Sequence, residues 1–154
     1  MIRKVTVDDY EAIAKLLIKT FRAFPWNEEW DYYQALQRVK QLDDGKYTRC
    51  YVYLINNKIV GVMCGKIVTY VEDVVLMIED FYVDLDYQRM GIGGKMLTLL
   101  EKEINEVDSF MLLTGKGFYS VDFYQKNGFV IQDDVVFMSK KIHWQSFYKI
   151  LLYR

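Results

Sequence analysis

The sequence predicts an α+β domain with a mixed, mostly antiparallel twisted sheet and helices on both of its faces. Short apolar runs of strand length alternate with segments in which apolar residues recur at helical spacing. The run over 74–84 is apolar on both faces, which is typical of a strand inside a sheet. Hydrophobic residues make up 52% of the 154 residues and charged residues 27%, so the chain can bury a core.

Two helices follow a short first strand, which is expected over residues 2–7. The first helix opens at the capping-box pattern Thr6-x-x-Asp9 and ends before Pro25, because proline disfavours a helical conformation in the residue before it. Asn27 is the expected N-cap of the second helix, which stops at 43–45. The apolar face of this second helix is expected to carry Trp30, Tyr33 and Leu36.

The complete predicted order is β-α-α-β-β-β-α-β-α-β-β. Asn56-Asn57-Lys58 separates two strands of this order and is expected to form a hairpin turn. After the second helix, the expected elements are strands over 51–55, 59–70 and 74–84, a loop and helix over 88–106, a strand over 110–113, a helix over 120–126, and a last hairpin over 129–132 and 135–140.

Composition limits the classes of function. The length predicts one domain, over 1–142, with an amphipathic C-terminal extension over 143–154 that packs on the domain or on a partner subunit of a homodimer. The net charge of −1 argues against a nucleic-acid partner. The two cysteines have no second pair, so neither a metal site nor a disulfide framework is expected. Without a signal region or a membrane-spanning run, the chain is expected to be cytoplasmic, with no membrane partner.

The most informative segment is the glycine-rich loop over 88–95, between a strand and a helix. A strand that turns through glycines into a helix leaves unpaired backbone N–H groups at the helix N-terminus. The helix dipole adds partial positive charge there, so the loop predicts an anion site, with a tight turn that binds nothing as the alternative. The Walker and dinucleotide spacings both fail at Met96.

The spacing that does fit is Gln/Arg-x-x-Gly-x-Gly/Ala, filled by Gln88, Gly91 and Gly93. It resembles the acyl-CoA pyrophosphate loop of the GNAT superfamily of N-acetyltransferases, whose element order also matches the predicted one. The resemblance implies that acetyl-CoA binds here as a co-substrate. The implied coenzyme-binding residues of the loop are Gln88, Arg89, Met90, Gly91, Ile92, Gly93, Gly94 and Lys95.

Two acids interrupt the predicted interior strand. Alternation with a period of two places Glu79 and Asp80 on opposite faces of the sheet, which excludes a carboxylate dyad. A structural salt bridge is one interpretation of either acid, because a buried carboxylate needs a partner. The segment 78–83 also resembles the strand of polyamine-type acetyltransferases, which implies that Glu79 faces the substrate amine as a general base. Phe81, Tyr82 and Val83 are then assigned to the coenzyme site.

A second motif lies near the C-terminus. Phe123-Tyr124-x-x-x-Gly128-Phe129 resembles the GNAT segment in which a tyrosine hydroxyl lies near the coenzyme sulfur, which implies that Tyr124 is the general acid. An ordinary packed aromatic is the alternative. GNAT proteins often carry an asparagine where this chain has Gly117, and that departure implies a lower affinity for the coenzyme.

The acceptor site is expected where aromatic residues and carboxylates meet, because this combination suits a cation. Packed tryptophans beside a helix cap are the alternative. The implied function is acetyl transfer to the primary amine of a small cationic molecule, by direct attack in a ternary complex. A protein or peptide N-acetyltransferase and a non-catalytic CoA-binding regulatory protein are the alternatives. The expected acceptor residues are Trp26, Glu29 and Trp30, with Glu79 and Asp80.

Overall fold

The computed structural model describes residues 1–140 and 142. The chain divides into two compact units, Met1–Leu112 and a second unit that begins at Leu113. The predicted extension at 143–154 lies outside the described residues, and the predicted domain boundary at 142 stays a prediction. The two units are described in turn.

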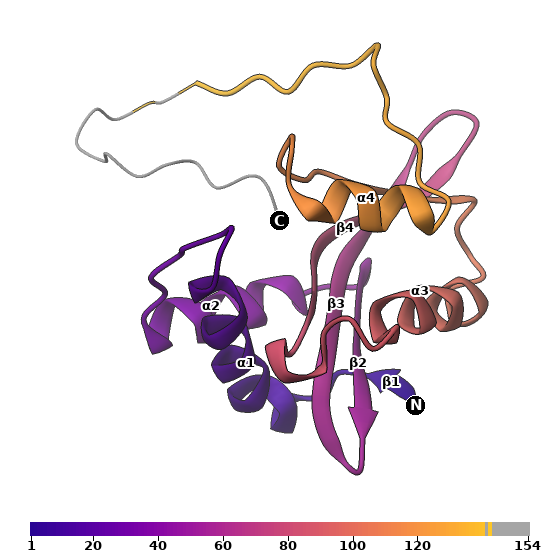
Figure 1. Ribbon diagram of the computed structural model, residues 1–154. Helices are drawn as coiled ribbons and strands as arrows, with labels where there is room; N and C mark the ends of the chain where they lie inside the picture. The colour runs from indigo at the N-terminus through magenta and orange to yellow at the C-terminus, as the bar shows by residue number, and fades with distance from the viewer. Residues whose placement is uncertain (141, 143–154) are drawn as a thin grey trace. The chain divides into compact units, whose positions relative to one another are not determined.

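The first unit contains a five-stranded sheet with the strand order β1-β2-β3-β4-β5 (Figure 1). Neighbouring strands are antiparallel except for β4 and β5, which are parallel. The predicted mixed, mostly antiparallel sheet is therefore confirmed, and β4 lies inside it. The strands are β1 (Ile2–Lys4), β2 (Thr48–Ile55), β3 (Lys58–Thr69), β4 (Val74–Val83) and β5 (Ser109–Leu112).

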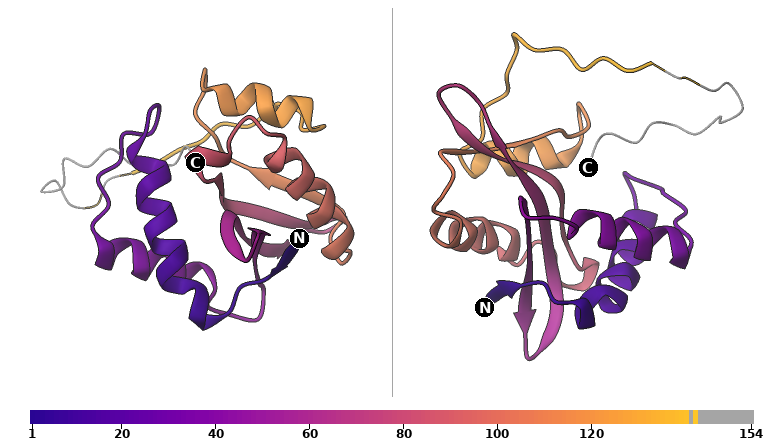
Figure 2. Two further views of the ribbon diagram at one scale, coloured as in Figure 1. Left: turned by 60° about the horizontal axis from the view of Figure 1, so that its bottom comes forward. Right: turned by 180° about the vertical axis from the view of Figure 1, so that it is seen from behind.

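Helices cover both faces of this sheet, as predicted. Helices α1 (Tyr10–Arg22) and α2 (Tyr32–Leu42) lie on one face, and α3 (Ile92–Glu103) lies on the other (Figures 1 and 2). The core under α1 and α2 includes Val52 and Tyr82 of the sheet. On the opposite face, a Cβ on Gly61 would lie 3.1 Å from Met96 Sδ, so α3 packs closely against β3.

The start of α2 differs from the prediction. Asp31 is the N-cap: its Oδ1 accepts from the Gln34 N–H at 2.9 Å, and Gln34 Oε1 accepts from the Asp31 N–H at 3.1 Å. Asn27 instead has a φ of 51° and lies in the connection before the helix. This reciprocal capping box satisfies two backbone donors, which Asn27 does not do. Trp30 therefore precedes α2, and Tyr33 is 81% exposed.

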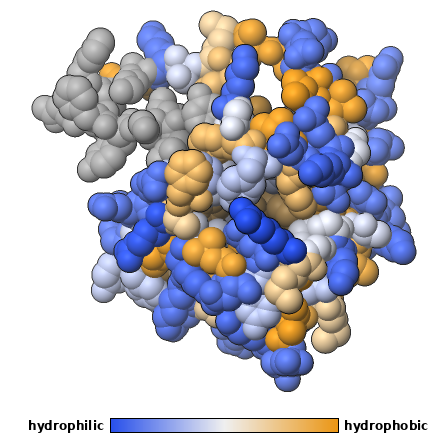
Figure 3. Space-filling model, viewed as in Figure 1, coloured by the Kyte–Doolittle hydropathy of each residue, from blue (hydrophilic) through white to orange (hydrophobic). Residues whose placement is uncertain are grey.

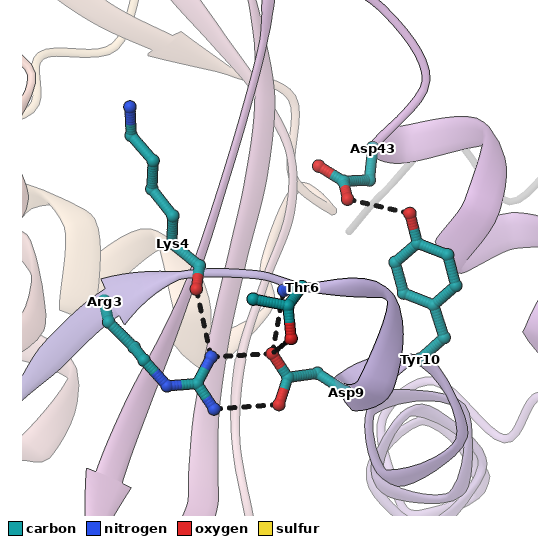
Figure 4. A network of polar contacts seen from close by, with 6 residues as sticks. All are labelled: Arg3, Lys4, Thr6, Asp9, Tyr10 and Asp43. Atoms are coloured by element: carbon teal, nitrogen blue, oxygen red, sulfur yellow. Dashed lines mark hydrogen bonds and ion pairs between the residues drawn. The ribbon is translucent and has the colours of Figure 1, made fainter.

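The capping box at the start of the first helix is confirmed. The pattern opens a 3-10 helix (Val7–Asp9) that continues into α1, and Asp9 Oδ2 accepts from the Thr6 N–H at 2.8 Å. The Arg3 guanidinium donates to both oxygens of the same carboxylate, from Nη1 to Oδ2 at 2.6 Å and from Nη2 to Oδ1 at 2.8 Å (Figure 4). These hydrogen bonds, first that from Arg3, lower the pKa of Asp9 to about 2. The network therefore joins β1 to α1.

We expect Asp9→Asn to lower the free energy of unfolding by about 2 kcal/mol at pH 7. An unfolded aspartate has a pKa of about 3.9, so stabilisation by the ionised form is complete above that pH. It is lost as the pH falls toward the folded value of about 2. Urea titrations of the wild-type protein and of Asp9→Asn should show that the difference between their free energies of unfolding shrinks as the pH falls from about 3.9 to about 2. Asp8→Asn, at an exposed neighbour, is the control and should change little at any pH; an equal loss in both variants contradicts the assignment.

The second unit contains the predicted short helix but not the predicted hairpin. Helix α4 (Tyr119–Lys126) ends at Asn127, and Gly128 follows with a φ of 88°. Residues 129–140 contain a turn at 133–134 but no strand. The hairpin prediction is wrong because strands need cross-strand hydrogen bonds and a buried face, whereas the apolar side chains here are exposed. These side chains are Val130, Ile131, Val135, Val136, Phe137 and Met138.

The surface seen in Figure 3 mixes hydrophilic residues with scattered apolar ones. Within residues 1–140 and 142, no helix combines the length and the apolar character that crossing a membrane requires.

The two cysteines, Cys50 and Cys64, are buried free thiols that face each other across β2 and β3. Both therefore belong to the core.

Candidate active site

The glycine-rich loop leads directly into α3, and the start of this helix carries no side-chain cap. Gly91 is the N-cap residue, with a φ of 75° that favours glycine. The first backbone bond of the helix runs from the Lys95 N–H to the Gly91 carbonyl at 3.1 Å. The N–H groups of Ile92, Gly93 and Gly94 precede that bond. This geometry suits an anion, and a Cβ at Gly91 would meet no atom within 4 Å.

Hydrogen bonds fix the path of the chain from β4 into this loop. Gln88 Nε2 donates to the Val83 carbonyl at 3.0 Å, so the first residue of the motif holds the loop against the end of the strand. The Asp84 N–H donates to the Val60 carbonyl at 2.8 Å. Asp84 also caps a 3-10 helix (Leu85–Tyr87), because its Oδ1 accepts from the Asp86 N–H at 3.2 Å.

Two lysines surround the buried carboxylate at this junction. Asp84 is 2% exposed, contacts Lys19 of α1, and lies 3.3 Å from Lys58 Nζ of β3. Burial alone raises the pKa of Asp84, but the hydrogen bonds led by Lys19 outweigh it, and the pKa is lowered. Lys58 also lies over the Tyr87 ring at 5.0 Å. This cluster anchors the entry to the loop, and no local sequence pattern predicts it, because Lys19 is 65 residues from Asp84.

Strand β4 contains a bulge at the predicted acidic pair. Cys64 pairs with Asp80 and Gly65 pairs with Ile78, so Glu79 has no partner on β3. A Cβ on Gly65 would lie 2.6 Å from the Met77 carbonyl oxygen, which is too close for any side chain. Glycine at position 65 therefore permits the close approach of the two backbones at the bulge.

The bulge brings both acids to one guanidinium. Arg38 Nη2 of α2 lies 2.9 Å from Asp80 Oδ1 and 3.5 Å from Glu79 Oε2. The expectation that the acids point away from each other is therefore wrong, because the extra residue breaks the alternation of the strand. Burial alone lowers the pKa of Arg38, but Asp80 and then Glu79 outweigh it and raise the pKa.

The two acids differ in exposure. The Asp80 side chain is 1% exposed, so its contact with Arg38 is the structural salt bridge that the sequence left open. The Glu79 side chain is 32% exposed and contacts Arg38 at a longer distance. Glu79 is therefore the carboxylate of this pair that solvent and a ligand can reach.

The tryptophans of the predicted acceptor region pack against the core under α1 and α2. Trp26 stacks edge-to-face on Phe21, with ring centroids 5.6 Å apart, and Phe21 stacks in the same way on Tyr82 at 5.2 Å. Trp30 Nε1 donates to Glu28, which is buried. Both rings thus pack on the core and stay half-buried, and their role at the acceptor site stays a prediction. Glu29 is exposed, and no sequence pattern singles out its buried neighbour Glu28 as the partner of Trp30.

In the second unit, Tyr124 is buried on α4. Its ring centroid lies 5.1 Å from that of Phe123 and 5.2 Å from that of Phe129. The Phe129 N–H donates to the Tyr124 carbonyl at 3.0 Å, which folds the chain back past Gly128. The aromatic motif is thus a local packing unit, and the catalytic role of the Tyr124 hydroxyl stays a prediction. Gly117 has a φ of 81°.

Among residues 1–140 and 142, no group of three or more histidine, cysteine or acidic side chains is arranged to hold a metal ion.

Comparison with known proteins identifies a family. The family model that describes the sequences of the Acetyltransferase (GNAT) family matches residues 10–129 of this chain. No curated protein matches the sequence. Among solved structures, a possible acetyltransferase from Clostridium difficile 630 has a TM-score of 0.80 at 21% identity, covering 93% of this chain and 98% of that one.

Two further structures are similar over most of their length. An aminoglycoside acetyltransferase from an uncultured soil metagenomic sample, in complex with sisomicin, has a TM-score of 0.71 at 21% identity, covering 93% of this chain and 96% of that one. AAC(6')-Iy in complex with the bisubstrate analog CoA-S-monomethyl-acetylneamine has a TM-score of 0.70 at 15% identity, covering 92% and 97%. At these identities the structures show a shared fold.

Proposed function

Because this chain belongs to the GNAT family of acetyltransferases, we propose that it transfers an acetyl group from acetyl-CoA to the primary amine of a small cationic molecule. The observation that carries the proposal is the uncapped N-terminus of α3, reached through a loop that Gln88 and Asp84 hold in place. The proposal includes the cytoplasmic location expected from the sequence.

We assign the coenzyme pyrophosphate to the loop over 88–95. The N–H groups of Ile92, Gly93 and Gly94 supply donors, and the dipole of α3 adds partial positive charge. Acetyl-CoA supplies the reaction with an activated acetyl thioester. The end of β4 at Phe81, Tyr82 and Val83 borders the thioester in this proposal, and a strand N–H near Val83 polarises its carbonyl.

Glu79 is the proposed general base. An alkyl amine with a pKa near 10.4 is mostly protonated at pH 7, and reaching its free base costs about 4.6 kcal/mol. The ammonium loses this first proton to solvent, and the free amine then attacks the thioester carbonyl while Glu79, directly or through water, accepts the second proton that the nitrogen must lose. A C–N bond forms and the C–S bond breaks, and Tyr124 donates a proton to the departing sulfur. The exposure of Glu79 beside a buried, fully engaged Asp80 supports this division of roles.

We expect Glu79→Gln to lower kcat/KM by about 100-fold, since a positioned base contributes roughly 10²–10⁴-fold. The acidic limb of the pH–rate profile should also shift, because the group that must be ionised there is gone. Profiles of kcat/KM against pH for both proteins test this. Glu72→Gln, at an exposed position in the turn between β3 and β4, is the control and should keep the original profile. An unchanged profile in Glu79→Gln assigns the base elsewhere.

A thiol-release assay tests the proposed function itself. Acetyl-CoA is supplied with a panel of simple amines, polyamines, aminoglycosides and peptides, and free CoA is followed against the rate without acceptor. Release that depends on a small amine, with acetylated product found by mass spectrometry, is the expected result. Release with peptides alone makes the protein a peptide N-acetyltransferase. No release with any acceptor, together with tight acetyl-CoA binding, makes it a non-catalytic CoA-binding protein.

A further inference from the structure

The candidate acceptor site contains a positive charge as well as carboxylates. Arg38 Nη2 lies 2.9 Å from Asp80 Oδ1 and 3.5 Å from Glu79 Oε2, and Arg38 Nε lies 3.5 Å from Asp80 Oδ2. An arginine stays protonated in proteins. With both acids ionised, the trio of Arg38, Glu79 and Asp80 therefore carries a net charge of −1, and the carboxylates that act most strongly on Arg38 are these two.

We propose that Arg38 is a specificity-determining residue, which restricts the acceptor to a molecule with a single positive charge beside Glu79. The inference rests on the proposed function and narrows it. It favours simple monoamines over polyamines and aminoglycosides, which carry further ammonium groups. Arg38 acts here through its charge, and contact between Arg38 and the acceptor is not required.

The geometry separates the roles of the two acids. Asp80 is buried and accepts from two nitrogens of Arg38, so its charge is balanced within the protein. Glu79 meets Arg38 at 3.5 Å, longer than the 2.7–2.9 Å typical of charge-assisted hydrogen bonds, and keeps oxygen lone pairs for an ammonium group. Within this trio, one ammonium is thus matched by one available carboxylate.

A second ammonium on the acceptor would meet the guanidinium. The Arg38 side chain is 27% exposed, so its positive charge can repel a cation that binds beside it. Two like unit charges 4 Å apart disfavour binding by roughly fivefold in water, and by more near a protein surface. Repulsion of the wrong substrate is a standard route to specificity.

Butylamine and 1,4-diaminobutane test the proposal, because they share a carbon chain and differ in one charge. We expect the wild-type protein to use butylamine with the higher kcat/KM. R38Q makes the trio −2 and should shift the ratio of the two kcat/KM values toward the diamine by about tenfold. D80N makes the trio neutral and should shift the ratio the other way.

The double variant R38Q/D80N restores a net charge of −1 without any ion pair, and the wild-type ratio should return. The double variant is also needed because R38Q leaves Asp80 buried without its partner and can therefore fail to fold. If R38Q does not fold, the ratios measured for D80N and the double variant test the proposal, and circular dichroism checks that both variants are folded. A ratio that stays constant across the folded variants overturns the role of Arg38 while leaving acetyl transfer intact. Absence of activity toward every amine in the wild type overturns the proposed function instead.

Discussion

Gly91→Val is expected to weaken acetyl-CoA binding by about 100-fold or more, measured by isothermal titration calorimetry. Gly91 has a φ of 75°, a conformation in which a β-branched residue is strained. A Cβ at this position meets no neighbouring atom, so the effect comes from the backbone rather than from a clash. When the turn changes conformation, the N–H groups of residues 92–94 move. Losing two hydrogen bonds to a charged group costs roughly 3–6 kcal/mol, which is more than a 100-fold change requires.

Gly45→Val provides a matched control for backbone strain. Gly45 lies in the turn before β2, also has a positive φ of 131°, and also has open space where a Cβ would lie. Both variants should lose stability in thermal unfolding, but Gly45→Val should bind acetyl-CoA like the wild type. Equal affinity in both variants would remove the loop from the coenzyme site.

Tyr124→Phe is expected to lower kcat by about 100-fold and to leave the Kd for acetyl-CoA nearly unchanged. The substitution removes the hydroxyl alone, and the ring retains its packing against Phe123 and Phe129. A phenol near pKa 10 is a weaker acid than a thiol near 8.5, so in water full proton transfer to the thiolate is uphill. A hydrogen bond that strengthens as the C–S bond breaks is sufficient for catalysis.

Tyr119→Phe is the control for this substitution. Tyr119 begins the same helix and is 53% exposed, so loss of its hydroxyl should leave kcat unchanged. Pre-steady-state and steady-state rates with a saturating amine compare the two variants directly. If Tyr124→Phe turns over as fast as Tyr119→Phe, the tyrosine is a packed aromatic and another group protonates the sulfur.

The parts of the fold that were predictable from sequence are encoded by residues close together in the chain. The capping box of Thr6 and Asp9 spans four residues, and the Asn56-Asn57 turn lies between its own two strands, with φ values of 48° and 61°. A helix stop such as Gly128 is likewise a local feature. The order of helices and strands could be predicted from these signals because each depends on the conformation of only a few neighbouring residues.

The errors in the fold arise where a choice depends on partners. Asn27 and Asp31 are both acceptable N-caps, and Gln34 selects Asp31 by completing a capping box. Alternation at Glu79 fails because the bulge is set by the approach of Gly65 on the neighbouring strand. The last hairpin has strand-like composition, but its apolar side chains find no buried face.

The same distinction divides the candidate site. The loop and helix to which the coenzyme is assigned were predictable because the glycines and the following helix are contiguous in sequence. Arg38 is 42 residues from Asp80, and Lys19 is 65 residues from Asp84, so neither ion pair leaves a local pattern. A buried acid within or just after an apolar strand signals that a cation must lie nearby, but it does not say which one.

The response of individual backbone amides to acetyl-CoA tests most directly whether the loop over 88–95 binds the coenzyme pyrophosphate. In ¹⁵N-labelled protein, the amide resonances of Ile92, Gly93 and Gly94 should move along saturable curves, because these N–H groups face the pyrophosphate in this account. The amide resonance of Gly45 should not shift when acetyl-CoA is added. Saturable binding that leaves the three loop amides unmoved, or no shift at millimolar acetyl-CoA, would contradict the account.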